Sequence, residues 1–147
     1  MAHVRKQIRD SIVTALTGLD TTGANVFQSR VYPISSGSLP ALTIYTKSES
    51  QEYATMTKPR TIERTLTVSV DSYVQAVTGY DNSLDQIAVE IEDAITADAT
   101  LGGLAKDARI VSYESDYSGD PDQPVAHATI TIDVDYVTIE NDPEVAA

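Results

Sequence analysis

The sequence predicts an α+β domain with a mostly antiparallel sheet of about five strands and two helices packed on one face. Two segments repeat apolar residues with the 3.6-residue period of a helix, one near the start and one after the middle of the chain. Elsewhere apolar and polar residues alternate, which is the pattern of a strand with one buried face. A chain of 147 residues is long enough to bury one core of its own. We expect that single domain to span residues 1–139.

The first helix is predicted over residues 3–19. Its basic residues lie opposite an apolar stripe, and Gly18 and the polar residues 20–23 end the segment. The stripe consists of Val4, Ile8, Ile12, Ala15, Leu16 and Leu19. Residues 30–34 then predict a short edge strand, because Pro33 has no N–H to donate to a neighbouring strand.

Two strands and a polar segment are predicted in the middle of the chain. Residues 41–46 alternate apolar with polar side chains. Residues 48–60 are polar and lack a sustained period, so they predict either a long hairpin arm or a mobile loop. Residues 61–74 predict a long strand, with Leu66, Val68 and Val70 on one face.

A second helix is predicted to begin at Ser83, because Ser83 and Gln86 have the spacing of a capping box. Its core stripe consists of Leu84, Ile87, Ala88, Ile91, Ala94 and Ile95, and the glycines at 102 and 103 break the helix. The predicted order of elements up to this point is one helix, three strands and a second helix.

A closing hairpin is predicted from residues 108–117 and 125–139, joined by the turn residues 118–124. In its second strand the even-numbered residues from 126 to 136 are apolar. The odd-numbered ones are polar: His127, Thr129, Thr131, Asp133 and Asp135. We expect residues 140–147 to form a frayed C-terminal tail.

Charge is unevenly distributed along the chain. Residues 1–64 hold eight basic and five acidic residues, a net +3, whereas residues 65–147 hold two basic and seventeen acidic residues, a net −15. Two regions of opposite charge could meet between copies of the chain, although a merely acidic, soluble domain would have the same composition. The overall charge of −12 argues against ordinary DNA binding, which needs a basic surface.

The composition also restricts compartment and chemistry. The chain has no cysteine, which excludes disulfides and sulfur-based zinc sites and fits a reducing compartment. Its first residues are charged where a signal peptide would be apolar, and no run of 18 apolar residues is present. We therefore expect a soluble protein of the cytoplasm with no membrane partner.

Catalytic patterns are missing from the sequence. The histidines are His3 and His127, and no phosphate-binding loop, nucleophile elbow or metalloprotease motif occurs. The acidic run from Asp116 to Asp122 weakly resembles a calcium loop, but His127 stands where the loop needs a glutamate, and a solvated hairpin tip explains it better. Asp133 and Asp135 share a strand face, which is more typical of solvent-facing charge than of acid–base catalysis. We expect no enzyme, no cofactor and no metal.

The order of the motifs resembles the lambda-type bacteriophage tail terminator family, also called minor tail protein U. An amphipathic first helix leads to Pro40-Ala41-Leu42-Thr43-Ile44-Tyr45, a polar arm, a long alternating strand and a second helix. The chain closes on a hairpin that ends in alternating Thr, Ile or Val and Tyr from Ala128 to Tyr136. The resemblance covers residues 4–139, and the order and spacing of the motifs carry it.

The resemblance implies a structural virion protein without catalytic activity. It implies a ring, a homohexamer in this family, that caps the head-proximal end of the tail tube and stops tube growth. The implied partners are the tail tube protein and a head-completion or connector protein, and DNA would pass through the ring without specific binding. Assembly would take place in the host cytoplasm.

Residues at candidate surfaces follow from the charge pattern. The candidates for contact with a neighbouring subunit or the tube are Arg5, Arg9, Tyr53, Lys58, Arg60 and Arg64. The candidate acids facing the lumen of a ring are Asp120, Asp122, Asp133 and Asp135. Tyr45, Tyr53, Tyr113 and Tyr117 fit two interpretations equally, namely interface anchors and packing at the sheet edge.

Two alternative functions remain open on the sequence. The nearer one is another component of the head–tail neck, such as a stopper or connector protein. The other is a monomeric acidic binding module, for example a mimic of nucleic acid. Native mass and binding to isolated tail tubes would separate these alternatives.

Overall fold

The computed structural model describes residues 2–23, 26–28, 40–75, 79–117 and 125–147. Across these residues the chain forms α1 (Val4–Leu16), β1 (Val26–Gln28), β2 (Ala41–Tyr53), β3 (Thr61–Gln75), α2 (Tyr80–Ala97), β4 (Asp107–Tyr117) and β5 (Val125–Ile139). The α+β class is confirmed, and both helices and the strands β2 to β5 follow the predicted order, whereas β1 was not predicted. The predicted strand at residues 30–34 lies outside the described residues.

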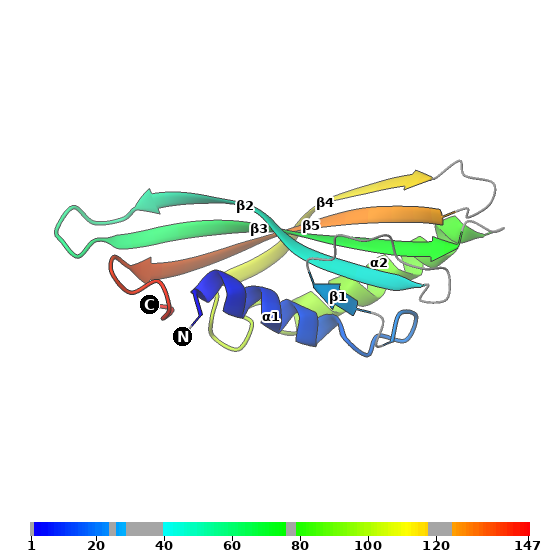
Figure 1. Cartoon of the computed structure of the whole chain (residues 1–147), viewed down its shortest axis with the longest axis horizontal. Helices are drawn as coiled ribbons and strands as arrows, with labels where there is room; N and C mark the ends of the chain where they lie inside the picture. Colours follow the sequence, from blue (N-terminus) through cyan, green and yellow to red (C-terminus); the bar gives the residue numbers. More distant parts are fainter. Residues whose placement is uncertain (1, 24–25, 29–39, 76–78, 118–124) are drawn as a thin grey trace.

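The described strands form one five-stranded sheet with the order β1-β2-β3-β5-β4. β1 runs parallel to β2, and the other neighbouring strands are antiparallel. Both helices lie on the same side of this sheet (Figure 1), as predicted. We call the opposite side the bare face; it carries the odd-numbered residues of β3 and β5, such as Thr67 and Asp133.

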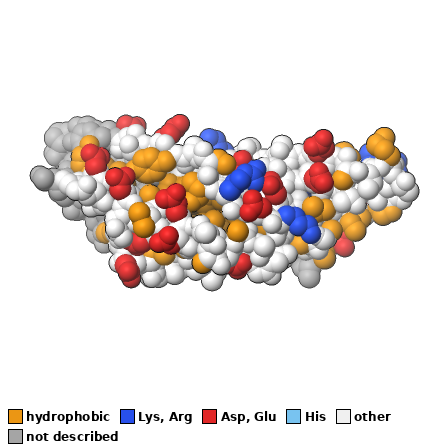
Figure 2. Space-filling model, turned by 180° about the vertical axis from the view of Figure 1, so that it is seen from behind, with side chains coloured by type: hydrophobic (Ala, Val, Ile, Leu, Met, Phe, Trp, Pro, Cys, Tyr) orange, Lys and Arg blue, Asp and Glu red, His pale blue; other side chains and the backbone are white. Residues whose placement is uncertain are grey.

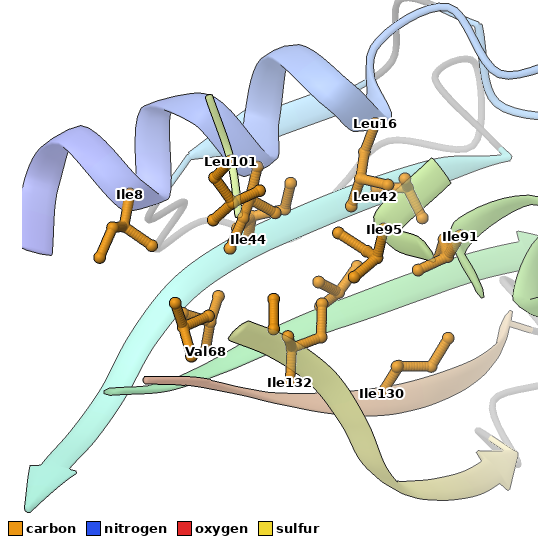
Figure 3. Close-up of a cluster of buried hydrophobic side chains, with 14 of the residues drawn as sticks. Ile8, Leu16, Leu42, Ile44, Val68, Ile91, Ile95, Leu101, Ile130 and Ile132 are labelled. Carbon is orange, nitrogen blue, oxygen red and sulfur yellow. The ribbon is translucent and has the colours of Figure 1, made fainter. Parts of the chain in front are cut away.

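The core fills the space between the helices and the sheet. It contains most of the apolar even-numbered residues of β3 and β5, the apolar stripes of both helices, and residues of β2 such as Leu42 and Ile44. Figure 3 shows Ile8 and Leu16 of α1 and Ile91 and Ile95 of α2 pointing toward strand residues such as Ile44. Each such side chain contributes roughly 1.5–3 kcal/mol when it is fully buried. The predicted helix stripes and the predicted strand alternation therefore form one core.

The helix ends differ from the prediction. α1 begins after His3, whose Nδ1 accepts a hydrogen bond from the backbone N–H of Arg5 at 3.0 Å. It ends at Leu16, before the predicted end at residue 19. α2 begins at Tyr80 and not at Ser83, because Gly79, at φ +86°, turns the chain into the helix without a side-chain cap. The N–H of Ser83 already bonds to the carbonyl of Gly79.

The polar segment after residue 47 continues the sheet. β2 extends as far as Tyr53, which pairs with Ile62 of β3. The hairpin-arm interpretation of residues 48–60 therefore describes β2, and residues 54–60 connect the two strands. The register shifts between Thr46 and Ser48, where β2 has a bulge. A bulge moves the side chains that follow it to the opposite face.

The C-terminal residues 140–147 are hydrogen-bonded to the rest of the fold, which corrects the prediction of a frayed tail. The carbonyl of Pro143 accepts a hydrogen bond from the N–H of Val4 at 2.9 Å, and the N–H of Ala147 donates to Val137 at 2.8 Å. The side chain of Gln7 donates to the carbonyl of Glu144 at 2.8 Å. The backbone N–H of Val4, at the start of α1, thus gains a partner that the sequence pattern does not reveal.

Candidate assembly surfaces

A buried ion cluster joins α1 to the sheet at the base of the β2–β3 hairpin. Glu49 of β2 accepts hydrogen bonds from Arg5 Nη2 at 2.9 Å and from Arg64 Nη1 at 3.0 Å. The hydroxyl of Tyr136 also donates to this carboxylate. The side chains of Glu49 and Arg64 are only 6% and 8% exposed. We call these four residues the Glu49 cluster.

The surroundings of Glu49 keep it ionised. Burial alone would raise the pKa of this carboxyl, but hydrogen bonds from Arg5, Tyr136 and Gln51 outweigh burial and lower the pKa to about 2. Burial and the bond to Glu49 raise the pKa of Tyr136 above its ordinary value. A carboxylate this acidic and this well bonded is a poor general base near neutral pH. The cluster therefore has the properties of a structural contact that holds α1 against the sheet.

The basic residues predicted at a subunit interface are mostly engaged within the chain. Arg5 and Arg64 belong to the Glu49 cluster, and Arg64 is too buried to form the exposed ion pair that the charge pattern predicted. Arg9 donates from Nη1 to the hydroxyl of Thr46 at 3.1 Å. Arg60 has Nε 3.8 Å from a carboxylate oxygen of Glu140.

Two of the predicted interface residues lie at the end of the β2–β3 hairpin. Tyr53 is 49% exposed, and the guanidinium of Arg60 lies 5.2 Å from the centre of its ring. Lys58 is exposed in the connecting loop. These two residues are therefore accessible to a partner, in contrast to Arg64.

The acids predicted to face a lumen are found on the bare face where the structure describes them. Asp133 accepts a hydrogen bond from the hydroxyl of Thr67 at 3.0 Å, and Asp135 accepts one from Thr65 at 2.9 Å. Each donor is the cross-strand neighbour of its acceptor. Asp135 also binds Arg109 Nη1 at 2.6 Å. Asp120 and Asp122 lie outside the described residues.

Carboxylates predominate over basic side chains on the side of the molecule drawn in Figure 2. On the bare face of β3, β5 and β4, acids such as Asp71, Asp133 and Glu114 share the surface with the single arginine Arg109 among the described residues. Burial would raise the pKa of Asp135, but bonds from Arg109 and Thr65 lower it overall. The bare face is thus a predominantly acidic surface.

Sequence reasoning missed a second accessible surface, at α2 and β4. Val89, Val111 and Tyr113 are 50%, 48% and 43% exposed. The register of β4 shifts between Ile110 and Ser112, so that Tyr113 pairs with Ile130 on the helix side of the sheet. Of the predicted tyrosine anchors, Tyr53 and Tyr113 are accessible and Tyr45 is partly buried. The side chain of Tyr117 lies outside the described set.

Neither a metal cluster nor a membrane span is found in the described ranges. No group of three or more His, Cys, Asp or Glu side chains there could hold a metal ion. Of the two helices described, neither combines the length and apolar character needed to cross a bilayer.

The comparison with known families decides which group of proteins this fold represents. Residues 3–136 match the family described as phage minor tail protein U. The chain belongs to this family. The match covers both helices and most of β5, so it extends over the Glu49 cluster, the bare face and the α2–β4 surface. This minor tail protein U family member is accordingly a structural protein of a phage tail and a component of the virion.

Comparisons outside the family are weaker. No curated protein sequence matches the chain. Among solved structures, a chain from the virion of a native gene transfer agent particle aligns with 90% of this chain and 92% of its own length, at 14% identity and a TM-score of 0.36. A structural similarity this low gives no information about the function of the protein.

Proposed function

We propose that this minor tail protein U family member is the tail terminator of its phage. Six copies form a ring that caps the head-proximal end of the tail tube, stops tube polymerisation and offers a surface to a head-completion or connector protein. The family match over residues 3–136 carries this proposal. The matched range includes most of residues 4–139, over which the sequence resembles the lambda-type terminators.

The two sides of the domain suit a part that ends a polymer. A tube grows because each ring presents the same surface to the next one, so a terminator needs one surface that fits the tube and another that does not. In this chain one side of the sheet is covered by helices, and the other is a bare face of Thr–Asp pairs. These two sides are chemically unlike.

The bare face is proposed to line the bore of the ring, with Asp133 and Asp135 facing the channel. Asp120 and Asp122, which lie outside the described residues, are proposed for the same surface. Basic side chains in the bore would bind phosphate and hold the DNA, whereas an acidic wall lets it pass. Six copies at −12 each carry −72 in total. The ring then has no specific affinity for nucleic acid.

In this role the protein catalyses no reaction. The ring acts by binding the tube protein, its own copies and the neck protein, with no cofactor. Subunits collect in the host cytoplasm before they join the virion at the head-proximal end of the tail.

Electron microscopy and native mass spectrometry with and without isolated tail tubes test the proposal. We expect a ring of sixfold symmetry on one end of each tube and an arrest of further tube growth. A strict monomer that never decorates tube ends would contradict the proposal. If that monomer also bound a basic protein in a titration, the alternative of an acidic binding module would replace the terminator proposal.

A gel-shift assay with duplex DNA tests the acidic bore. We expect no measurable binding at physiological salt, and we expect a ring structure in which the bare face lines the channel. Binding under those conditions, or a bore lined by Arg and Lys, would show that the bare face faces elsewhere.

A further inference from the structure

A groove lies between α2 and β4, with a volume of about 300 Å³. Val89, Ile110, Tyr113 and Ile130 provide its apolar lining, and the carboxylates of Asp85 and Glu92 lie at its rim. We call it the α2–β4 groove. Val89 and Tyr113 are about half exposed, so apolar surface remains open to water in the subunit.

The groove is acidic as well as apolar. Asp85 lines the groove together with Tyr113. Burial raises the pKa of Tyr113 most, and the negative charges of Asp85 and Asp81 raise it further. A partner for this groove therefore needs an apolar side chain to fill it and a cation to meet its rim.

The tip of the β2–β3 hairpin, residues 53–60, has the complementary composition. Met56 is 89% exposed and Tyr53 is 49% exposed. This segment contains Lys58 and Arg60 and no acidic residue. Arg60 lies near Glu140, whereas Lys58 is exposed in the loop beyond it. The flexible, unbranched side chain of methionine adapts well to an apolar groove.

The tip and the groove lie toward opposite ends of an elongated subunit. The β2–β3 loop forms one end in Figure 1, and the first part of α2 and the last part of β4 lie toward the other. Figure 2 shows hydrophobic side chains among carboxylates near that second end, and hydrophobic and basic side chains at the hairpin end. The tip therefore cannot reach the groove of its own subunit.

We propose that the hairpin tip of one copy, through Met56 and Lys58, docks into the α2–β4 groove of the next copy. This inference rests on the ring of the proposed function, for which it names the contact between subunits. A contact between two different surfaces of the same chain is head-to-tail, and it closes into a ring when the rotation between copies permits. The opposite charges of tip and rim fix the direction of the contact.

Cysteine cross-linking tests this contact directly, because the natural chain has no cysteine. In the double variant Met56→Cys with Val89→Cys, each copy has one thiol at the tip and one at the groove. We expect mild oxidation of tube-bound protein to give a ladder of disulfide-linked multimers, which a reducing agent reverses. The variant Met56→Cys with Thr14→Cys, whose second thiol is exposed on α1, is the matched control and should give no ladder.

Each single-cysteine variant separates a head-to-tail contact from a symmetric one. Met56→Cys alone and Val89→Cys alone should remain monomeric on the gel. Efficient disulfide dimers from either one would show a symmetric contact and overturn the inference. Rings seen by electron microscopy without a ladder from the double variant would overturn the inference and leave the terminator proposal standing. Absence of rings from the natural chain would overturn both.

A charge exchange tests the direction of the contact. Lys58→Glu and Asp85→Lys should each raise the protein concentration needed for half-maximal ring formation by about two- to fivefold at low salt. The combined variant should return it close to the natural value, because the pair is restored with its charges reversed. Additive losses in the combined variant would contradict the pairing of tip and rim.

Discussion

The two faces of the sheet use carboxylates in different ways. On the helix-covered face, the side chain of Glu49 is 6% exposed and is bonded to two arginines and a tyrosine. On the bare face, Asp135 is 38% exposed and shares its bonds with a threonine and an exposed arginine. A buried carboxylate needs all its partners, whereas an exposed one can exchange them for water. The covered face therefore holds the subunit together, and the bare face remains available for function.

Removal of Glu49 should have the largest effect on stability. Glu49→Ala leaves the buried Arg64 and the Tyr136 hydroxyl without their shared acceptor. Breaking a buried ion pair from one side costs about 3–5 kcal/mol, so we expect a loss of that size in the free energy of unfolding, measured with urea. A loss below about 1 kcal/mol would place Glu49 in the same class as the exposed acids.

The acid sensitivity of the subunit should depend on the same residue. The pKa of Glu49 is about 2 in the fold, below its ordinary value of 4.5. Because the folded-state pKa is the lower one, its contribution to stability is complete above about pH 4.5 and is lost as the pH falls to about 2. Glu49→Gln should flatten the fall in the urea midpoint over this range. An unchanged slope would assign the acid sensitivity to Asp10, Glu90 and Asp135, whose pKa values are also lowered.

Removal of the C-terminal residues 143–147 should have an intermediate effect. The deletion takes away the carbonyl that accepts from Val4 at the start of α1. An unpaired backbone donor in a buried position costs about 1–3 kcal/mol, and Val4 is fully buried. We expect a loss in that range and faster amide exchange at the start of α1. Unchanged exchange there would mean that water replaces the tail.

Asp133→Asn on the bare face should have the smallest effect. Its bond to Thr67 is one cross-strand pair, and such pairs contribute roughly 0.2–1 kcal/mol. We expect stability to change within that range and tube capping to be preserved. A large loss of stability would contradict the contrast between the two faces.

The sequence pattern was sufficient for most of the fold. Helical stripes and strand alternation predicted both helices, the long strands and the residues of the core. Burial on one side makes apolar residues recur at a fixed spacing along the sequence. Two of the missed features depend on register. The bulge between Thr46 and Ser48 turns Glu49 toward the helices, and the bulge between Ile110 and Ser112 turns Tyr113 toward α2. No property of Lys47 or Val111 marks those bulges in the sequence.

The charge pattern was a poor guide to the surfaces for a related reason. Arg5 and Arg64 look like free positive charges in the sequence, but both bind Glu49. Glu49 lies 44 residues from Arg5 and 15 residues from Arg64 along the chain. Ion pairs between distant residues form only once the strands are in register. The exposed candidates are Tyr53, at the end of β2, and Lys58, in the connecting loop.

The bulge in β4 has a consequence for subunits waiting to assemble. β4 is the outer strand at its end of the described sheet, and long flat edges of this kind promote the growth of insoluble fibres by strand addition. At Val111 the edge departs from a straight ladder, and Glu114 and Asp116 place negative charge along the strand that follows. An incoming strand would lose its pairing at the bulge and meet like charges beyond it. The bulge and the acids therefore make the β4 edge a poor template for the addition of a second strand.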